Sequence, residues 1–153
     1  MWTRWNTHMA VQADPADVLA VLTYVDAIRD WSPVDFELDD MDVDRLHGGA
    51  HARVVGRVAG FGVGFDVEVH EVSHARLALM ARGPVELDVE YRVEPADTGA
   101  SVEAAVSVRS AGGAAGTIVS RAVNTLLAAG ALDRALARIC SEAEASGELA
   151  LAA

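Results

Sequence analysis

The sequence contains one short motif that is associated with metal chemistry, His-Glu-Val-Ser-His at residues 70–74. In zinc hydrolases the two histidines of an H-E-x-x-H motif share one helix face and bind the metal, while the glutamate acts as general base. Here the motif joins two segments that alternate as β-strands do, residues 63–69 and 76–81. Positions four apart on a strand lie about 13 Å from each other, which is too far to bind one ion. We therefore interpret the motif as a surface hairpin and expect no metal, with a zinc hydrolase through His70 and His74 as a remote alternative.

A glycine-rich segment, Gly-Gly-Ala-Ala-Gly at residues 112–116, lies between a predicted strand and a predicted helix. Nucleotide-binding loops occupy such positions, but a dinucleotide-binding fold also needs a further parallel strand with an acidic residue near its end. No strand pattern follows this helix, and the chain has no lysine that would serve a phosphate-binding loop. We expect the glycines to let the backbone turn sharply into the helix, and we expect no cofactor.

The other candidate nucleophiles and bases are isolated from one another. Cys140 is the single cysteine and follows Ile139 near the end of the last predicted helix, which favours a packed thiol over a nucleophile. The sequence has no G-x-S-x-G segment, so a serine hydrolase of the α/β type is not indicated. His8, His47 and His51 are scattered along the chain, and we expect each to be a solvated side chain.

Composition and charge restrict the partners of the protein. The 153 residues include 23 acidic and 12 basic ones, which gives a formal net charge of −11, and every basic residue is an arginine. A field of this sign repels nucleic acid and anionic membranes, and the lack of lysine excludes a Schiff-base mechanism. Hydrophobic residues make up 52% of the chain, but no uninterrupted apolar run approaches about 18 residues. We therefore expect a soluble, cytoplasmic globular protein without a signal peptide or membrane span.

The hydropathy pattern changes twice along the chain. Alternation over residues 2–12 predicts an opening strand, and Asp14 before Pro15 predicts the start of the first of two short helices, residues 15–23 and 26–31. From residue 36 onward the alternation returns, in segments separated by glycine and proline turns: residues 51–58, 61–70, 76–81, 85–93 and 101–108. One apolar and one polar face in each segment predict an antiparallel sheet of about six or seven strands that is solvated on one side.

The last third of the chain has helical spacing. Apolar residues recur from Ile118 to about Glu144, which predicts one long C-terminal helix, and residues 146–153 are expected to form a frayed tail. The elements therefore predict a single domain over residues 1–145. One helix covers only part of the apolar face of a curved sheet, so the rest of that face must collapse, oligomerise or enclose a cavity.

The candidate site is this inner face of the predicted sheet. The alternation places on it the apolar residues Val54, Val58, Phe65, Val67, Leu79, Leu87, Val89 and Val106. Its polar exceptions are few: Tyr91 on a central strand, Thr7 on the first strand, Tyr24 and Trp31 on the short helices that should rim the cavity, and Ser120 and Asn124 on the last helix. Apolar walls with a few orienting donors are typical of small-molecule sites. For Tyr91 and Trp31 the pattern favours core filling with one hydrogen bond each over a role in binding. If there is chemistry, Tyr91 is the first candidate for a general acid or oxyanion donor.

The order of elements and three short segments resemble the START-like helix-grip superfamily, also called SRPBCC, and within it the polyketide cyclase/dehydrase and lipid transport branch. The segments are Ala-Asp-Pro-Ala-Asp-Val-Leu at residues 13–19, Asp-Trp-Ser-Pro at 30–33, and Glu-Pro-Ala-Asp-Thr-Gly-Ala-Ser-Val at 94–102. The resemblance covers about residues 3–145 and extends to the long final helix. It implies an α+β domain with a curved antiparallel sheet wrapped around the C-terminal helix. It carries over no catalytic residue, because the superfamily has no universal one.

The resemblance also implies a function for the expected cavity. Members of the superfamily include lipid carriers, hormone and flavonoid binders, and aromatase/cyclases, so we expect a lipid-like or polyketide-like small molecule to bind there. The ligand-binding residues we predict are Tyr24, Trp31, Val54, Phe65, Val67, Leu79, Leu87, Val89, Tyr91 and Asn124. The alternative is a polyketide cyclase or dehydratase that uses the same cavity, with Tyr91 as its catalytic residue. We expect a monomer or a homodimer.

Overall fold

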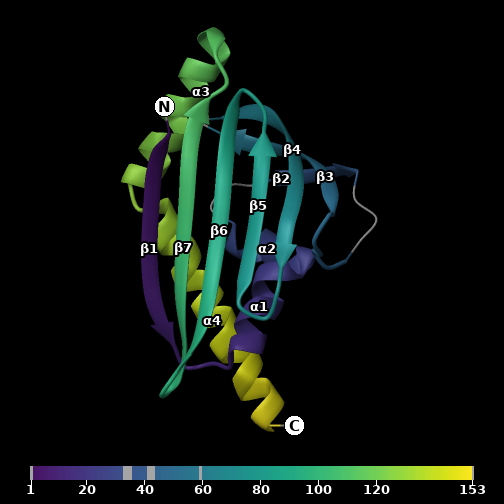
Figure 1. The fold of residues 1–153 in the computed structure, drawn as a ribbon, viewed down its shortest axis with the longest axis vertical. Coiled ribbons are helices and arrows are strands. Elements are labelled where there is room, and N and C mark those ends of the chain that lie inside the picture. Colours follow the sequence, from purple (N-terminus) through teal and green to yellow (C-terminus); the bar gives the residue numbers. More distant parts are fainter. Residues whose placement is uncertain (1, 33–35, 41–43, 59, 153) are drawn as a thin grey trace.

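A computed structural model of the chain describes residues 2–32, 36–40, 44–58 and 60–152 (Figure 1). The strands are β1 (Thr3–Val11), β2 (Phe36–Asp40), β3 (His51–Val58), β4 (Phe61–Val72), β5 (Arg76–Arg82), β6 (Val85–Ala96) and β7 (Gly99–Ser110). The helices are α1 (Pro15–Thr23), α2 (Val25–Trp31), α3 (Gly113–Ala128) and α4 (Ala131–Ala152). Two short helices therefore follow the first strand, as the pattern predicted.

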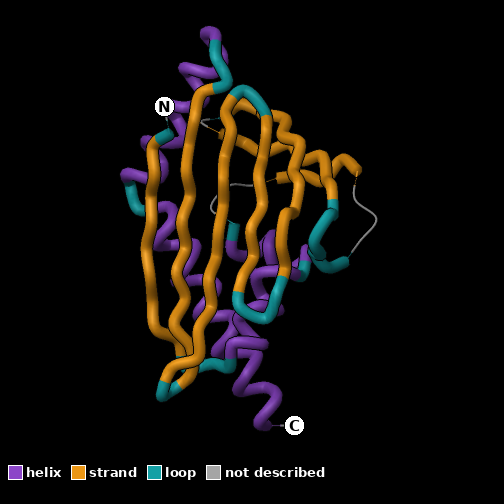
Figure 2. The backbone as a smooth tube through the Cα atoms, in the orientation of Figure 1, coloured by secondary structure: helices purple, strands orange, loops and turns teal. Residues whose placement is uncertain are grey.

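Within these described ranges the strands form one seven-stranded antiparallel sheet, in the order β1-β7-β6-β5-β4-β3-β2. Each strand from β2 to β7 pairs with its neighbour in the chain, so the sheet is a meander that β1 completes beside β7. Figure 1 shows β2 and β3 crossing the direction of β6 and β7, which makes the sheet strongly curved. Figure 2 shows the helices gathered behind the sheet, on one of its two faces.

The core lies between that inner face and the helices. Side chains with almost no exposed surface come from α1, α4 and alternate positions of the strands: Val18, Leu22, Val69, Leu77, Val85, Val93, Val102, Val108, Leu136 and Ile139. The α4 helix packs against β1 and against α1. The period-2 alternation therefore identified the buried face, and the predicted α+β helix-grip class is confirmed.

The C-terminal region differs from the prediction in two respects. The segment predicted as one helix is divided into α3 and α4, which bend by 57° at the break. Gly130 causes the break, because its φ of 92° lies in the left-handed region, where a glycine costs no steric energy. The α4 helix then continues to Ala152, through the segment for which a frayed tail was predicted.

No single helix in the described ranges is long and apolar enough to cross a membrane, although α3 and Ala131–Gly147 pass that test as a bent pair.

The break predicts opposite effects for two glycine-to-alanine substitutions. Gly130→Ala should destabilise the protein by about 1–2 kcal/mol, because alanine resists the left-handed conformation. The matched control is Gly147→Ala inside α4, where an added Cβ would lie 3.6 Å from Asp17 Oδ2, an ordinary contact. This control should be neutral or stabilising by up to about 1 kcal/mol, because alanine favours helices. Urea denaturation measures both, and a Gly130→Ala protein as stable as the control would contradict the assignment.

Candidate functional site

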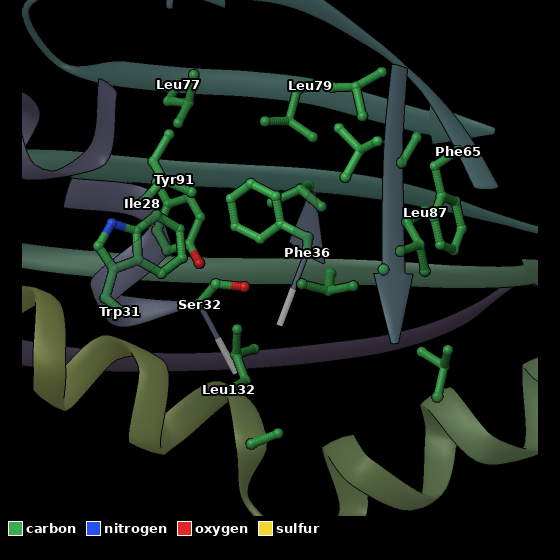
Figure 3. A pocket seen from close by; sticks show the side chains of 18 of the residues that line it. Ile28, Trp31, Ser32, Phe36, Phe65, Leu77, Leu79, Leu87, Tyr91 and Leu132 are labelled. Atoms are coloured by element: carbon green, nitrogen blue, oxygen red, sulfur yellow. The ribbon is translucent and has the colours of Figure 1, made fainter. Parts of the chain in front are cut away.

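A pocket of about 290 Å³ lies between the concave inner face of the sheet and the helices (Figure 3). Its described lining consists of Leu22, Ile28, Trp31, Ser32, Phe36, Leu46, Val54, Gly56, Val58, Phe65, Val67, Leu77, Leu79, Ala81, Leu87, Val89, Tyr91, Val106, Val123, Leu126, Leu127, Ala131 and Leu132. None of these side chains is charged. Only three carry a polar atom, those of Trp31, Ser32 and Tyr91, so the wall is almost entirely apolar.

The pleat of the strands explains how one surface collects these residues. Every second side chain of a strand points to the same face, so β3, β4, β5 and β6 each contribute at least two side chains to the wall. The α2 helix closes one end with Ile28 and Trp31. The α3 helix and the first turn of α4 close the side opposite the sheet, with apolar residues on their inner faces.

The polar groups gather at one end of the pocket. Figure 3 shows Trp31, Ser32 and Tyr91 together at this end, with Phe36 toward the middle and Phe65 and Leu87 beyond it. The Trp31 indole donates a hydrogen bond to the Val21 carbonyl at 2.9 Å. Its ring meets that of Tyr91 edge to face, with 5.8 Å between centroids and an interplanar angle of 71°. These contacts fix both aromatic rings.

The hydroxyl of Tyr91 forms no hydrogen bond with any described residue. The side chain is only 4% exposed. Burial raises the pKa of this phenol, because the charged form loses its hydration. The group therefore stays protonated at neutral pH and can donate a hydrogen bond to a molecule in the pocket.

The structure brings most of the predicted site residues onto one wall and leaves two outside it. Those that line the pocket are Trp31, Val54, Phe65, Val67, Leu79, Leu87, Val89 and Tyr91. Tyr24 does not, since it is 44% exposed and its ring lies under the guanidinium of Arg45, 4.8 Å away. Asn124 does not either, because its Oδ1 accepts a hydrogen bond of 2.9 Å from the Trp5 indole, which ties α3 to β1. Thr7 and Ser120 are also absent from the lining.

Several lining residues were not among the predicted site residues. They are Leu22, Ile28, Ser32, Phe36, Leu46, Gly56, Leu77, Ala81, Val123, Leu126, Leu127, Ala131 and Leu132. Leu77 and Ala81 share the alternation of Leu79 on β5, so the pattern contained their signal. Phe36 begins β2, where a strand of only five residues gives little alternation to read. The lining residues of α3 and α4 could not be predicted, because apolar spacing does not give the rotation of a helix about its axis relative to the sheet.

The His-Glu-Val-Ser-His motif forms a hairpin, as predicted. The β4 strand ends at Val72 and β5 begins at Arg76, so the helix that zinc chemistry requires does not form. His70 and His74 are both exposed, and Glu71 forms an ion pair with Arg76. No group of three histidine, cysteine or carboxylate side chains in the described residues has the arrangement for a metal ion. The zinc hydrolase alternative therefore lacks the helix on which it depends.

The glycine segment and the cysteine also have structural roles. The β7 strand ends at Ser110 and α3 begins at Gly113, and φ values of 106° at Gly112 and 74° at Gly113 make the turn between them. Cys140 is buried in α4. Burial, together with the charge of Glu144, raises the pKa of this thiol to about 11. At neutral pH Cys140 is thus a protonated, packed side chain, as its sequence context predicted.

The outer face of the sheet is charged and carries an acid-sensitive cluster. Arg76 bonds Glu90 at 2.8 Å, and Arg92 also bonds Glu90. The hydrogen bond from Arg76, aided by that from Arg92, lowers the pKa of Glu90 below its ordinary 4.5. A lowered pKa means that the ionised carboxylate stabilises the fold above the unfolded-state pKa, and that this contribution is lost as pH falls below it.

This cluster predicts a pH dependence of stability. Glu90→Gln should flatten the fall in the free energy of unfolding below about pH 4.5, since the amide cannot titrate. The control is Asp88→Asn, which changes an exposed carboxylate on the same strand that has no ion pair among the described residues. Urea titrations from pH 6 to pH 3 compare the two variants with the parent. Identical acid slopes in all three proteins would contradict a stabilising role for the Glu90 charge.

The curved antiparallel sheet, the two short helices after β1 and the C-terminal helix together define an α+β protein with the helix-grip fold. Solved structures share it. The protein CV1439 from Chromobacterium violaceum is 14% identical with a TM-score of 0.69, over 92% of this chain and 96% of that one. The protein TTHA0849 from Thermus thermophilus is also 14% identical with a TM-score of 0.69, over 95% and 99%. The protein Ara h 8.0201 is 12% identical with a TM-score of 0.59, over 92% and 99%.

At the level of sequence, no protein-family model matches the chain, and no curated protein sequence matches it. The identities to the solved structures are low, so these similarities establish the fold.

Proposed function

We propose that this protein binds an apolar or aromatic small molecule, lipid-like or polyketide-like, in the pocket between the sheet and the C-terminal helices. The observation that carries the proposal is an open volume of about 290 Å³ with an uncharged and almost wholly apolar described lining. Protein interiors are normally packed without voids much larger than a water molecule. An apolar guest would remove this wall from water, which is favourable by about 25 cal/mol per Å².

A neutral fluorophore tests the proposal directly. Prodan, an uncharged naphthyl ketone whose emission moves to the blue in apolar surroundings, is titrated with the protein. We expect saturable binding of one Prodan per chain with a blue shift, because one pocket of suitable size and polarity is offered. A signal that rises linearly without saturation, or that is equal for the unfolded protein in urea, would contradict a specific pocket.

A second candidate is a polyketide cyclase or dehydratase that uses the same pocket, which is the activity implied by the branch that the sequence resembles. The observation in its favour is the Tyr91 hydroxyl, a protonated donor on the pocket wall that forms no hydrogen bond with a described residue. Such a donor can polarise a ligand carbonyl in a desolvated site. With a linear poly-β-ketone thioester as substrate, Tyr91→Phe should lower the rate at saturation. Equal rates for parent and variant would remove Tyr91 from the reaction.

A further inference from the structure

We infer that the pocket selects a neutral molecule of one or two rings that carries a carbonyl group, and that the Tyr91 hydroxyl recognises this carbonyl by donating a hydrogen bond. The inference rests on the proposed function, since it names the ligand class for the same pocket. It assigns Tyr91 the role of a specificity-determining residue in binding and does not depend on any reaction.

The distribution of charge argues against an anionic ligand. All twelve basic residues of the chain are arginines that lie in the described ranges, and none of them lines the pocket. A carboxylate or phosphate in this site would lose its hydration and meet no cation. Burial of an unpaired ion costs far more than the contacts of one small molecule return. Fatty acids and phospholipids with a buried head group are therefore disfavoured.

The pocket size argues for a small molecule. Its volume is about 290 Å³. A water molecule occupies about 30 Å³ in the liquid, so this space holds roughly ten water-sized groups. A body of one or two aromatic rings matches this volume.

The Tyr91 hydroxyl argues for a carbonyl on that molecule. This hydroxyl is open to the pocket and forms no hydrogen bond with a described residue, so a ligand that displaces water from this end of the pocket has to supply an acceptor to keep the donor satisfied. The edge-to-face contact with Trp31, itself held by the Val21 carbonyl, fixes the direction of the phenol. A ketone or ester oxygen that sits at this end of the pocket would accept the bond, while its apolar body would lie along the wall toward Phe65 and Leu87 (Figure 3).

Three matched competitors test this ligand class. The three compounds are naphthalenes substituted at the same ring position. Acetylnaphthalene carries a ketone, ethylnaphthalene carries no polar group, and naphthoate carries a carboxylate. Each compound is titrated as a competitor against Prodan bound to the parent protein and to Tyr91→Phe. The Prodan affinity of each protein is measured separately. The matched control is Tyr24→Phe, which removes the same atom from the exposed tyrosine outside the pocket.

We expect the preference for acetylnaphthalene over ethylnaphthalene to fall about tenfold in Tyr91→Phe and to stay unchanged in Tyr24→Phe. Naphthoate should bind the parent at least roughly tenfold more weakly than the ketone. Ethylnaphthalene binding to Tyr91→Phe, at the parent's affinity, shows that the variant pocket is intact. An unchanged ketone preference in Tyr91→Phe, or naphthoate bound as tightly as the ketone, would overturn the inference while leaving the proposed function standing. Failure of all three compounds to displace Prodan would also overturn the inference, whereas absence of saturable Prodan binding to the parent would overturn the proposed function.

Discussion

Replacing Val67 by arginine is expected to lower the affinity for Prodan by at least about 100-fold, because it places an unpaired cation on the apolar wall of the pocket. Val67 lies on the inner face of β4, between Phe65 and Val69, and lines the pocket. Its side chain is half-buried, so an arginine there reaches the pocket space without entering the packed core. The larger side chain also occupies volume that the ligand needs.

The control for this variant is Val55→Arg. Val55 lies on the neighbouring strand β3, where it faces outward and is 37% exposed. The same chemical change on the outer face should leave Prodan affinity within about twofold of the parent, since surface substitutions have small effects. Fluorescence titration gives both affinities, and thermal unfolding confirms that both variants fold. If Val67→Arg is too unstable to assay, Val89→Trp fills the pocket with an apolar side chain instead. Equal affinities for the inner-face and outer-face variants would contradict the placement of the site.

The second large effect concerns the helix that closes the core. Ile139→Ala in α4 should destabilise the protein by about 2–5 kcal/mol, because Ile139 is 0% exposed and its truncation leaves a cavity. Ile118→Ala in α3 makes the same change at a side chain that is 63% exposed, and should alter stability by no more than about 0.5 kcal/mol. Urea denaturation with a common m-value measures the difference.

This pair of variants separates the roles of the two C-terminal helices. The first ten residues of α4 include several that are buried in the core, whereas in α3 only Gly116 is buried. We therefore attribute fold stability to α4 and the closing of one pocket wall to α3, which contributes Val123, Leu126 and Leu127. Comparable losses of stability for Ile118→Ala and Ile139→Ala would contradict this division.

The sheet and its inner face could be predicted because successive side chains of a strand point alternately to the buried and to the solvated face, so apolar and polar residues alternate in the sequence. Phe65, Val67 and Leu79 were assigned to the cavity from alternation alone, and all three line the pocket. The hairpin at residues 70–74 was predictable for the same reason, since alternation on both sides left no room for a helix. Local periodicity was sufficient in these places because the antiparallel sheet buries only one face.

Three features could not be read from local pattern. Tyr24 sits between two short helices, and so few turns do not reveal which way a side chain points. Asn124 is bound by Trp5, a partner 119 residues away whose position depends on the completed sheet. Gly130 lies in an alanine-rich stretch where the apolar spacing continues unbroken, so the bend appears only in the backbone φ. Each of these depends on tertiary packing and not on neighbouring residues.

The most direct test of the pocket is a methyl NMR titration of the protein with acetylnaphthalene. Leu79, Leu87 and Val89 have methyl groups on the pocket wall, while Val55 and Ile118 have exposed ones away from it. We predict that the signals of the first three residues shift and saturate at one ligand per chain, while the signals of Val55 and Ile118 stay in place. Shifts confined to the exposed methyl groups, or no saturable shift on the inner face, would contradict the existence of a ligand site between the sheet and the C-terminal helices.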